Sequence, residues 1–143
     1  MSSMGSSDSS LGRLREVRQA LLRLHKILLD VERHAYERSH GRIENSYEYL
    51  QLVMWDAWFA WLHSLSELIV QIDELFDAEE PMTEASAAAL IEQTRHLLAA
   101  SENGSDFQRK YFRALQKSPD VVIAHSSLVK LLGRRVDPRK AVH

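Results

Sequence analysis

The chain has 143 residues, of which 45% are hydrophobic and 27% are charged, and its formal net charge is −2. These values are typical of one soluble globular domain, and such a small net charge gives no reason to expect nucleic-acid binding. The chain contains no cysteine, which excludes disulfides, thiol catalysis and cysteine-ligated metal sites and fits a reducing cytoplasm.

The two ends of the chain differ in composition from the middle. Residues 1–8 are small and polar, and we expect a disordered leader there rather than a secretory signal, because no apolar run follows a basic start. We expect residues 9–133 to form one helical domain and residues 134–143 to form a basic, flexible tail. The longest apolar runs span only a few residues, so we expect no membrane-spanning helix.

Residues 9–39 have the periodicity of a long amphipathic helix. Apolar residues recur at alternating spacings of three and four, which is typical of a helix that packs along one seam. The seam consists of Leu14, Val17, Leu21, Leu24, Leu28, Val31 and Ala35. Gly41 follows this segment and can adopt the positive φ that ends a helix.

Residues 45–77 predict a second long helix, with Asn45 as its N-terminal cap. Its broad apolar face contains Trp55, Trp58, Phe59, Leu62, Leu65, Ile69, Ile72 and Phe76. Each of the first two helices then exceeds about 30 residues, or roughly 45 Å at a rise of 1.5 Å per residue. Helices of that length joined by a short turn predict a long antiparallel hairpin.

Shorter helices follow. Thr83 is a good cap for a third helix, which ends in the turn at residues 101–105, and Ser105 caps a fourth. Ser118 followed by Pro119 indicates that the fourth helix is kinked or split before it ends near Leu132. The sequence therefore predicts an all-α, antiparallel up-down four-helix bundle with a long first hairpin and a kinked or split fourth helix.

The aromatic face of the second helix has two interpretations. It forms one wall of the core, or some of its side chains line a pocket for a flat ligand or a partner helix. His25, Glu32 and Tyr36 lie together on the first helix, beside the leucine seam. These three residues either contribute to such a pocket or form a polar layer in the bundle. The candidate pocket residues are Trp55, Trp58, Phe59, His25, Glu32 and Tyr36.

Asp73 interrupts the apolar face of the second helix. A carboxylate in that position needs a partner if it is buried. In a continuous hairpin Asp73 lies opposite the start of the first helix, where Arg13 occupies the core-facing side. We therefore predict a buried structural pair between Arg13 and Asp73. The alternative is that the end of the helix frays and Asp73 is exposed to solvent.

Four polar residues permit a divalent-metal site between the second and third helices. His63 and Glu67 are four residues apart, as are Glu92 and His96, and a turn near residue 80 sets the two pairs opposite each other. Two histidines and two carboxylates can bind Zn²⁺ or another divalent ion. Both pairs fall outside the apolar stripes, however, so exposed charge pairs explain them better, and we expect no cofactor.

A resemblance covers about a quarter of the chain. Residues 40–73, HGRIENSYEYLQLVMWDAWFAWLHSLSELIVQID, resemble a stretch of small bacterial helical proteins of unknown function, and the resemblance implies no activity. No nucleophile elbow, phosphate loop, zinc-protease motif or complete di-iron motif occurs, so the sequence favours a non-enzymatic protein without establishing it.

The expected function follows from the expected shape. The first hairpin is longer than the third helix can cover, so we expect part of its apolar surface to remain exposed. We therefore predict a cytoplasmic interaction or scaffold module that forms a twofold dimer through this hairpin and can bind another protein, but neither nucleic acid nor membrane. The alternative is a bundle that binds a small ligand or a divalent metal.

Overall fold

The computed structural model describes residues 9–133, which form six α-helices, one 3-10 helix and, within this range, no strand. The predicted leader at residues 1–8 and tail at residues 134–143 lie outside the described residues. The all-α class is confirmed, whereas the four-helix bundle is not. The helices in chain order are α2 (Ser10–His40), α3 (Ser46–Trp55), η2 (Ala57–Leu62), α4 (His63–Asp77), α5 (Glu84–Leu97), α6 (Asp106–Lys117) and α7 (Pro119–Leu132).

Most helices begin where the sequence predicts, because a capping side chain stands there. Each of these caps accepts a hydrogen bond from a backbone N–H in the first turn; they are Ser9, Asn45, Thr83, Ser105 and Ser118. Pro119 occupies the first turn of α7, so the predicted split of the last helix is confirmed. Gly41 ends α2 with φ 91° and ψ 169°, a conformation that essentially only glycine adopts.

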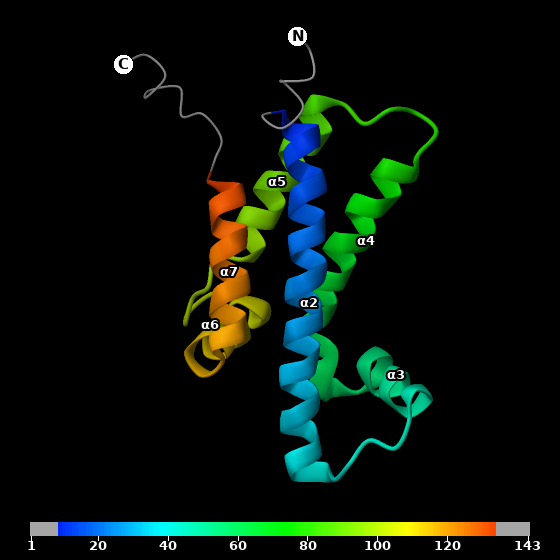
Figure 1. Cartoon of the computed structure of the whole chain (residues 1–143), viewed down its shortest axis with the longest axis vertical. Helices are drawn as coiled ribbons and strands as arrows, with labels where there is room; N and C mark the ends of the chain where they lie inside the picture. The colour runs from blue at the N-terminus through cyan, green and yellow to red at the C-terminus, as the bar shows by residue number, and fades with distance from the viewer. Residues whose placement is uncertain (1–8, 134–143) are drawn as a thin grey trace.

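α2 is the central helix of the fold. It packs against η2, α4, α5 and α7, which surround its upper two-thirds in Figure 1. The first five residues of its apolar seam, from Leu14 to Leu28, are fully buried, and burial of each leucine stabilises the fold by about 1.5–3 kcal/mol. Val31 and Ala35 are only half-buried. Among the described residues, none of the helices has the length and apolar character needed to cross a membrane.

The predicted second helix is broken into three pieces. Asp56 takes an extended conformation, with φ −83° and ψ 139°, between α3 and η2. Its carboxylate accepts a hydrogen bond of 2.8 Å from the backbone N–H of Trp58, so the residue that ends α3 also caps the next helix. α3 consequently leaves the axis of α4 and projects to the side of the molecule (Figure 1). The first hairpin is therefore not the continuous pair of helices that the sequence predicts.

The break also changes the register between α2 and α4. Asp73 forms its ion pair with Arg18, and their side chains are 37% and 33% exposed. The predicted buried pair between Arg13 and Asp73 is thus corrected: the partner lies five positions further along α2, and the pair is partly open to solvent. Arg13 itself is 8% exposed. The prediction assumed a continuous hairpin, whereas the ten residues of α3 lie outside it.

Candidate functional site

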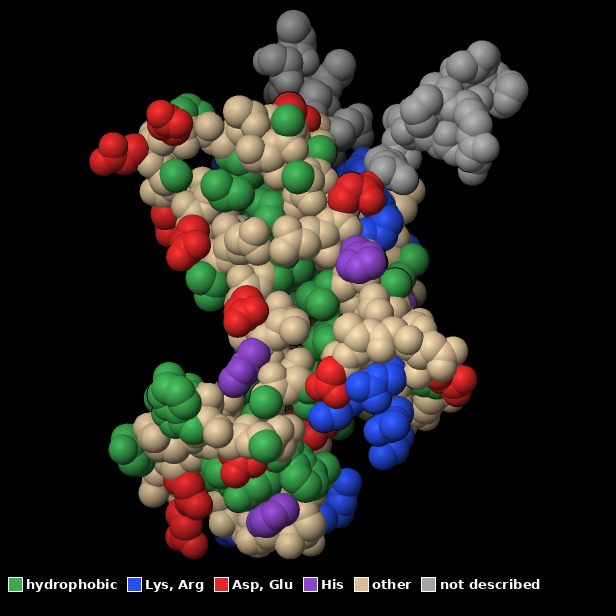
Figure 2. All heavy atoms as spheres, turned by 180° about the vertical axis from the view of Figure 1, so that it is seen from behind, with side chains coloured by type: hydrophobic (Ala, Val, Ile, Leu, Met, Phe, Trp, Pro, Cys, Tyr) green, Lys and Arg blue, Asp and Glu red, His purple; other side chains and the backbone are tan. Residues whose placement is uncertain are grey.

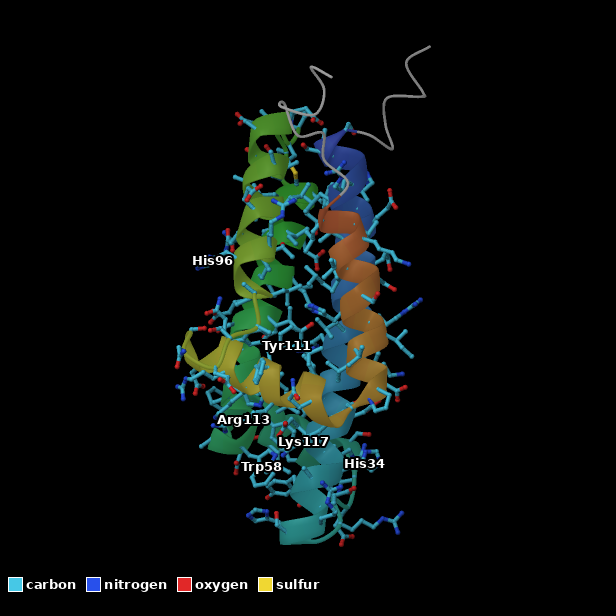
Figure 3. The ribbon with its side chains drawn as sticks, turned by 90° about the vertical axis from the view of Figure 1, so that its left-hand side faces the viewer. His34, Trp58, His96, Tyr111, Arg113 and Lys117 are labelled. Carbon is cyan, nitrogen blue, oxygen red and sulfur yellow. The ribbon has the colours of Figure 1, made fainter. Side chains whose placement is uncertain are left out.

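A cleft of about 660 Å³ lies between α2, η2 and α6, and we call it the α2–α6 cleft. Its volume falls in the range of small-molecule sites. In Figure 3, Arg113 and Lys117 extend from α6, Trp58 lies below that helix, and His34 lies across from it on α2. The cleft is lined by Val31, Glu32, His34, Ala35, Arg38, Ala57, Trp58, Trp61, Lys110, Arg113, Ala114, Lys117, Ser118 and Pro119.

The indole rings of Trp58 and Trp61 form the aromatic floor of the cleft. Residues three apart lie on the same side of a 3-10 helix, so the short η2 segment turns both rings toward the same space. Trp58 packs edge-on against Tyr36, with ring centroids 5.6 Å apart, and Trp61 packs against Phe107 at 5.3 Å. These contacts hold the floor between α2 on one side and α6 on the other.

Glu32 adds a carboxyl group to this floor. Burial raises its pKa above the ordinary value, and the rise is opposed by the indole of Trp58, by the positive charges of Lys110 and Lys117, and by the indole of Trp61. The Nε1 atom of Trp58 is fully buried, yet no described residue forms a hydrogen bond with it. The indole of Trp58 lies beside the carboxyl group of Glu32 and lowers its pKa. A buried donor without a partner is uncommon in folded proteins and calls for an explanation.

A second set of aromatic contacts fixes the position of α6. Phe107 stacks on Tyr111 at 5.5 Å, and the fully buried Tyr111 contacts His125 on α7 through its hydroxyl, which lies 2.7 Å from Nδ1. Burial raises the pKa of Tyr111 and lowers the pKa of His125, so both groups are neutral near physiological pH and the hydroxyl donates to the imidazole. This attachment determines where Arg113 and Lys117 lie relative to the cleft.

Four of the residues predicted for an aromatic pocket come together at or behind the cleft. Glu32 and Trp58 line it. Tyr36 packs behind Trp58, and Phe59 is fully buried 5.9 Å from the Tyr36 ring. The positions of Glu32 and Tyr36 beside the leucine seam therefore predicted part of the cleft floor correctly.

The other two predicted pocket residues lie elsewhere. Trp55 is the last residue of α3 and is 73% exposed, because the break at Asp56 carries it away from η2. His25 is half-buried on α2 and does not line the cleft; burial lowers its pKa. The prediction grouped Trp55 with Trp58 because a continuous second helix sets both on one face. It added His25 because this residue lies with Glu32 and Tyr36 beside the leucine seam of the first helix.

The four predicted metal ligands do not assemble. Nε2 of His63 lies 3.0 Å from the carbonyl oxygen of Val53, and Glu92 pairs with Arg95. Glu67 and His96 line a separate shallow depression between α4 and α5, and His96 lies far from the cleft in Figure 3. No group of three or more histidine, aspartate or glutamate residues in the described range is placed to hold a metal ion.

The basic residues of the cleft were not among the predicted site residues. Lys110, Arg113 and Lys117 have spacings of three and four, which places them on one face of α6. That spacing was a usable signal. The sequence does not show, however, that this face meets α2, since the position of α6 depends on the contacts of Phe107 and Tyr111.

The chain was compared with protein-family models, with curated proteins and with solved structures. No family model, curated protein or solved structure matches it. The α2–α6 cleft and the surface of the chain are therefore the features that bear on its function.

Proposed function

We propose that this chain is a non-enzymatic, cytoplasmic binding module that holds the apolar body of a small molecule in the α2–α6 cleft. The observation that carries the proposal is the aromatic floor that Trp58 and Trp61 form in a cleft of about 660 Å³. Pockets of this size with an apolar lining and a few polar groups are the usual sites for small ligands.

The floor also supplies a source of affinity. Trp58 is only half-buried, although Tyr36 and η2 surround it, so part of its ring faces the cleft. A ligand that covers 100 Å² of such apolar surface gains about 2.5 kcal/mol from burial. The small side chains of Ala35 and Ala57 leave room for a flat group above the indole rings.

Binding of a neutral, environment-sensitive dye tests the proposal. N-phenyl-1-naphthylamine should bind saturably at one site, and its fluorescence should rise as it leaves water. Ala57→Trp should fill the cleft and abolish binding, whereas Ala89→Trp on α5 should not, since both alanines are exposed but only Ala57 lines the cleft. Saturable binding that is equal in both variants, or no saturable binding, would contradict the proposal.

The exposed face of α3 supports a second candidate function, which is self-association. Tyr47 and Trp55 are each 73% exposed and Leu50 is 53% exposed; with Met54 they form an apolar stripe along the helix. Figure 2 shows hydrophobic side chains gathered on the lobe that α3 forms, beside a hollow. The spacing of three and four along Tyr47, Leu50 and Met54 suits packing against a second copy of the same helix.

The size of the stripe predicts a weak dimer. Large aromatic side chains bury roughly 150–250 Å² each, so the stripe offers roughly 400–500 Å² per copy. A twofold pair then buries roughly 800–1,000 Å², near the lower limit of specific interfaces. Light scattering over a concentration series should show a dimer that dissociates on dilution. Leu50→Glu should abolish it, whereas Ile123→Glu on α7, where Ile123 is 65% exposed, should not; the reverse result would place the interface on α7.

A further inference from the structure

Positive side chains surround the α2–α6 cleft. Arg38 approaches it from α2, and Lys110, Arg113 and Lys117 approach it from α6. Among the residues that line the cleft, all of which the structure describes, Glu32 is the one acidic residue. The rim therefore carries an excess of positive charge, although the chain as a whole has a net charge of −2.

Most of these positive side chains form no ion pair within the described part of the chain, although Lys110 and Lys117 act electrostatically on Glu32. Nζ of Lys110 lies 3.7 Å from the carboxylate of Asp106, an exposed pair that contributes little. The ion pairs of the described residues do not include Arg38, Arg113 or Lys117. Three exposed cations beside the aromatic floor of this cleft are thus available to a negatively charged group.

The N-terminal end of α7 adds to the positive charge around the cleft. Ser118 and Pro119 line the cleft, so the N-terminal end of this 14-residue helix faces it. The N-terminus of a helix carries a partial positive charge that favours anions. This end of α7 reinforces the side-chain charges of α6 and does not define a site by itself.

Glu32 determines where a negative group can lie. Its carboxyl group is half-buried beside Trp58 and within electrostatic reach of Lys117, whereas the side chains of Arg38, Arg113 and Lys117 are exposed at the edge of the cleft. A ligand anion on the floor would meet Glu32, but at the rim it meets Arg38, Arg113 and Lys117. Extending the function proposed above, on which this step rests, we infer that the ligand is an amphipathic anion. Its apolar body lies on Trp58 and Trp61, and its carboxylate, sulfonate or phosphate lies at the rim.

Three matched probes test the charge of the ligand. 1-Naphthaleneacetate, 1-naphthaleneethanol and 1-naphthylmethylamine share one aromatic body and are respectively anionic, neutral and cationic. Titration at low salt should show the acid binding about fivefold tighter than the alcohol, and the amine binding weakest. Added salt should reduce the advantage of the acid, because screening weakens interactions of exposed charges.

Charge reversal on the rim provides the matched variants. Lys117→Glu should weaken binding of the acid about fivefold and leave the alcohol unchanged, and Arg113→Glu should do the same at a second exposed position. Lys130→Glu is the control: Lys130 is also exposed and in the last turn of its helix, but it lies outside the cleft, so the acid should lose less than about twofold.

The outcomes separate this inference from the function on which it rests. If the acid and the alcohol bind equally and neither responds to Lys117→Glu, the cleft binds small molecules but the inference of an anion is overturned. A preference for the amine also overturns it, as does equal weakening of acid and alcohol by Lys117→Glu. If none of the three probes binds, the proposed function fails together with the inference.

Discussion

Tyr111→Phe should lower the free energy of unfolding by about 1–2 kcal/mol. The substitution keeps the ring that stacks on Phe107 and removes only the hydroxyl, which lies 2.7 Å from Nδ1 of His125. One hydrogen bond contributes about 0.5–1.5 kcal/mol net, and an acceptor left without its partner adds a further cost. Because His125 is half-buried, water can replace the hydroxyl only in part. For a domain of this size the loss corresponds to a fall in Tm of roughly 4–8 °C.

Urea denaturation followed by circular dichroism at about pH 8, where histidine is neutral, measures this loss. Tyr49→Phe is the matched control, since the Tyr49 hydroxyl is half-buried and makes a longer contact of 3.4 Å with the carbonyl oxygen of Leu29. We expect it to cost about 0.5 kcal/mol or less. If both substitutions have the same effect, the contact between Tyr111 and His125 does not hold α6 to α7 in the way described.

Three further substitutions test other parts of the structure. Gly41→Ala should destabilise the fold by about 1–3 kcal/mol in urea denaturation, because φ is 91° there, although no atom lies within 4 Å of the added methyl group; an unchanged midpoint would contradict this. Glu84→Gln should lower stability at neutral pH, because backbone N–H groups of α2 lower the pKa of Glu84. That loss should disappear as the pH falls through the folded-state pKa, and a difference that persists in acid would argue against the contact. Glu32→Gln should change stability in the opposite direction. Burial raises the pKa of Glu32, so the charged form of this residue lowers the stability of the fold at neutral pH. The variant should then be more stable than the native chain near neutrality and equal to it below the unfolded-state pKa of Glu32; thermal denaturation across pH checks both carboxyl groups.

Part of the candidate site was accessible from the sequence. Glu32 and Tyr36 stand beside the leucine seam of α2, and this position already suggested a polar group near the tryptophans. The spacing of Lys110, Arg113 and Lys117 likewise shows that they share a face of α6. Neither pattern shows that the two groups meet, because that depends on how α6 packs against η2 and α7.

The sequence by itself determined the ends of most helices and the buried seam of α2. Serine, threonine and asparagine caps, Pro119 and Gly41 act through hydrogen bonds and φ values within a few residues, so they operate wherever the helix later packs. The seam of α2 follows from helical periodicity, which is also a local property.

Only the tertiary structure decided that residues 45–77 form three pieces. This stretch contains no proline or glycine to mark a break, and Asp56 has the spacing of an ordinary solvent-facing residue. The break lets Trp58 and Trp61 turn toward α2 and α6, while Trp55 stays on α3 and Asp73 meets Arg18 instead of Arg13. These outcomes depend on the combined contacts between helices that are far apart in the chain. A local pattern of residues does not show which of those contacts form.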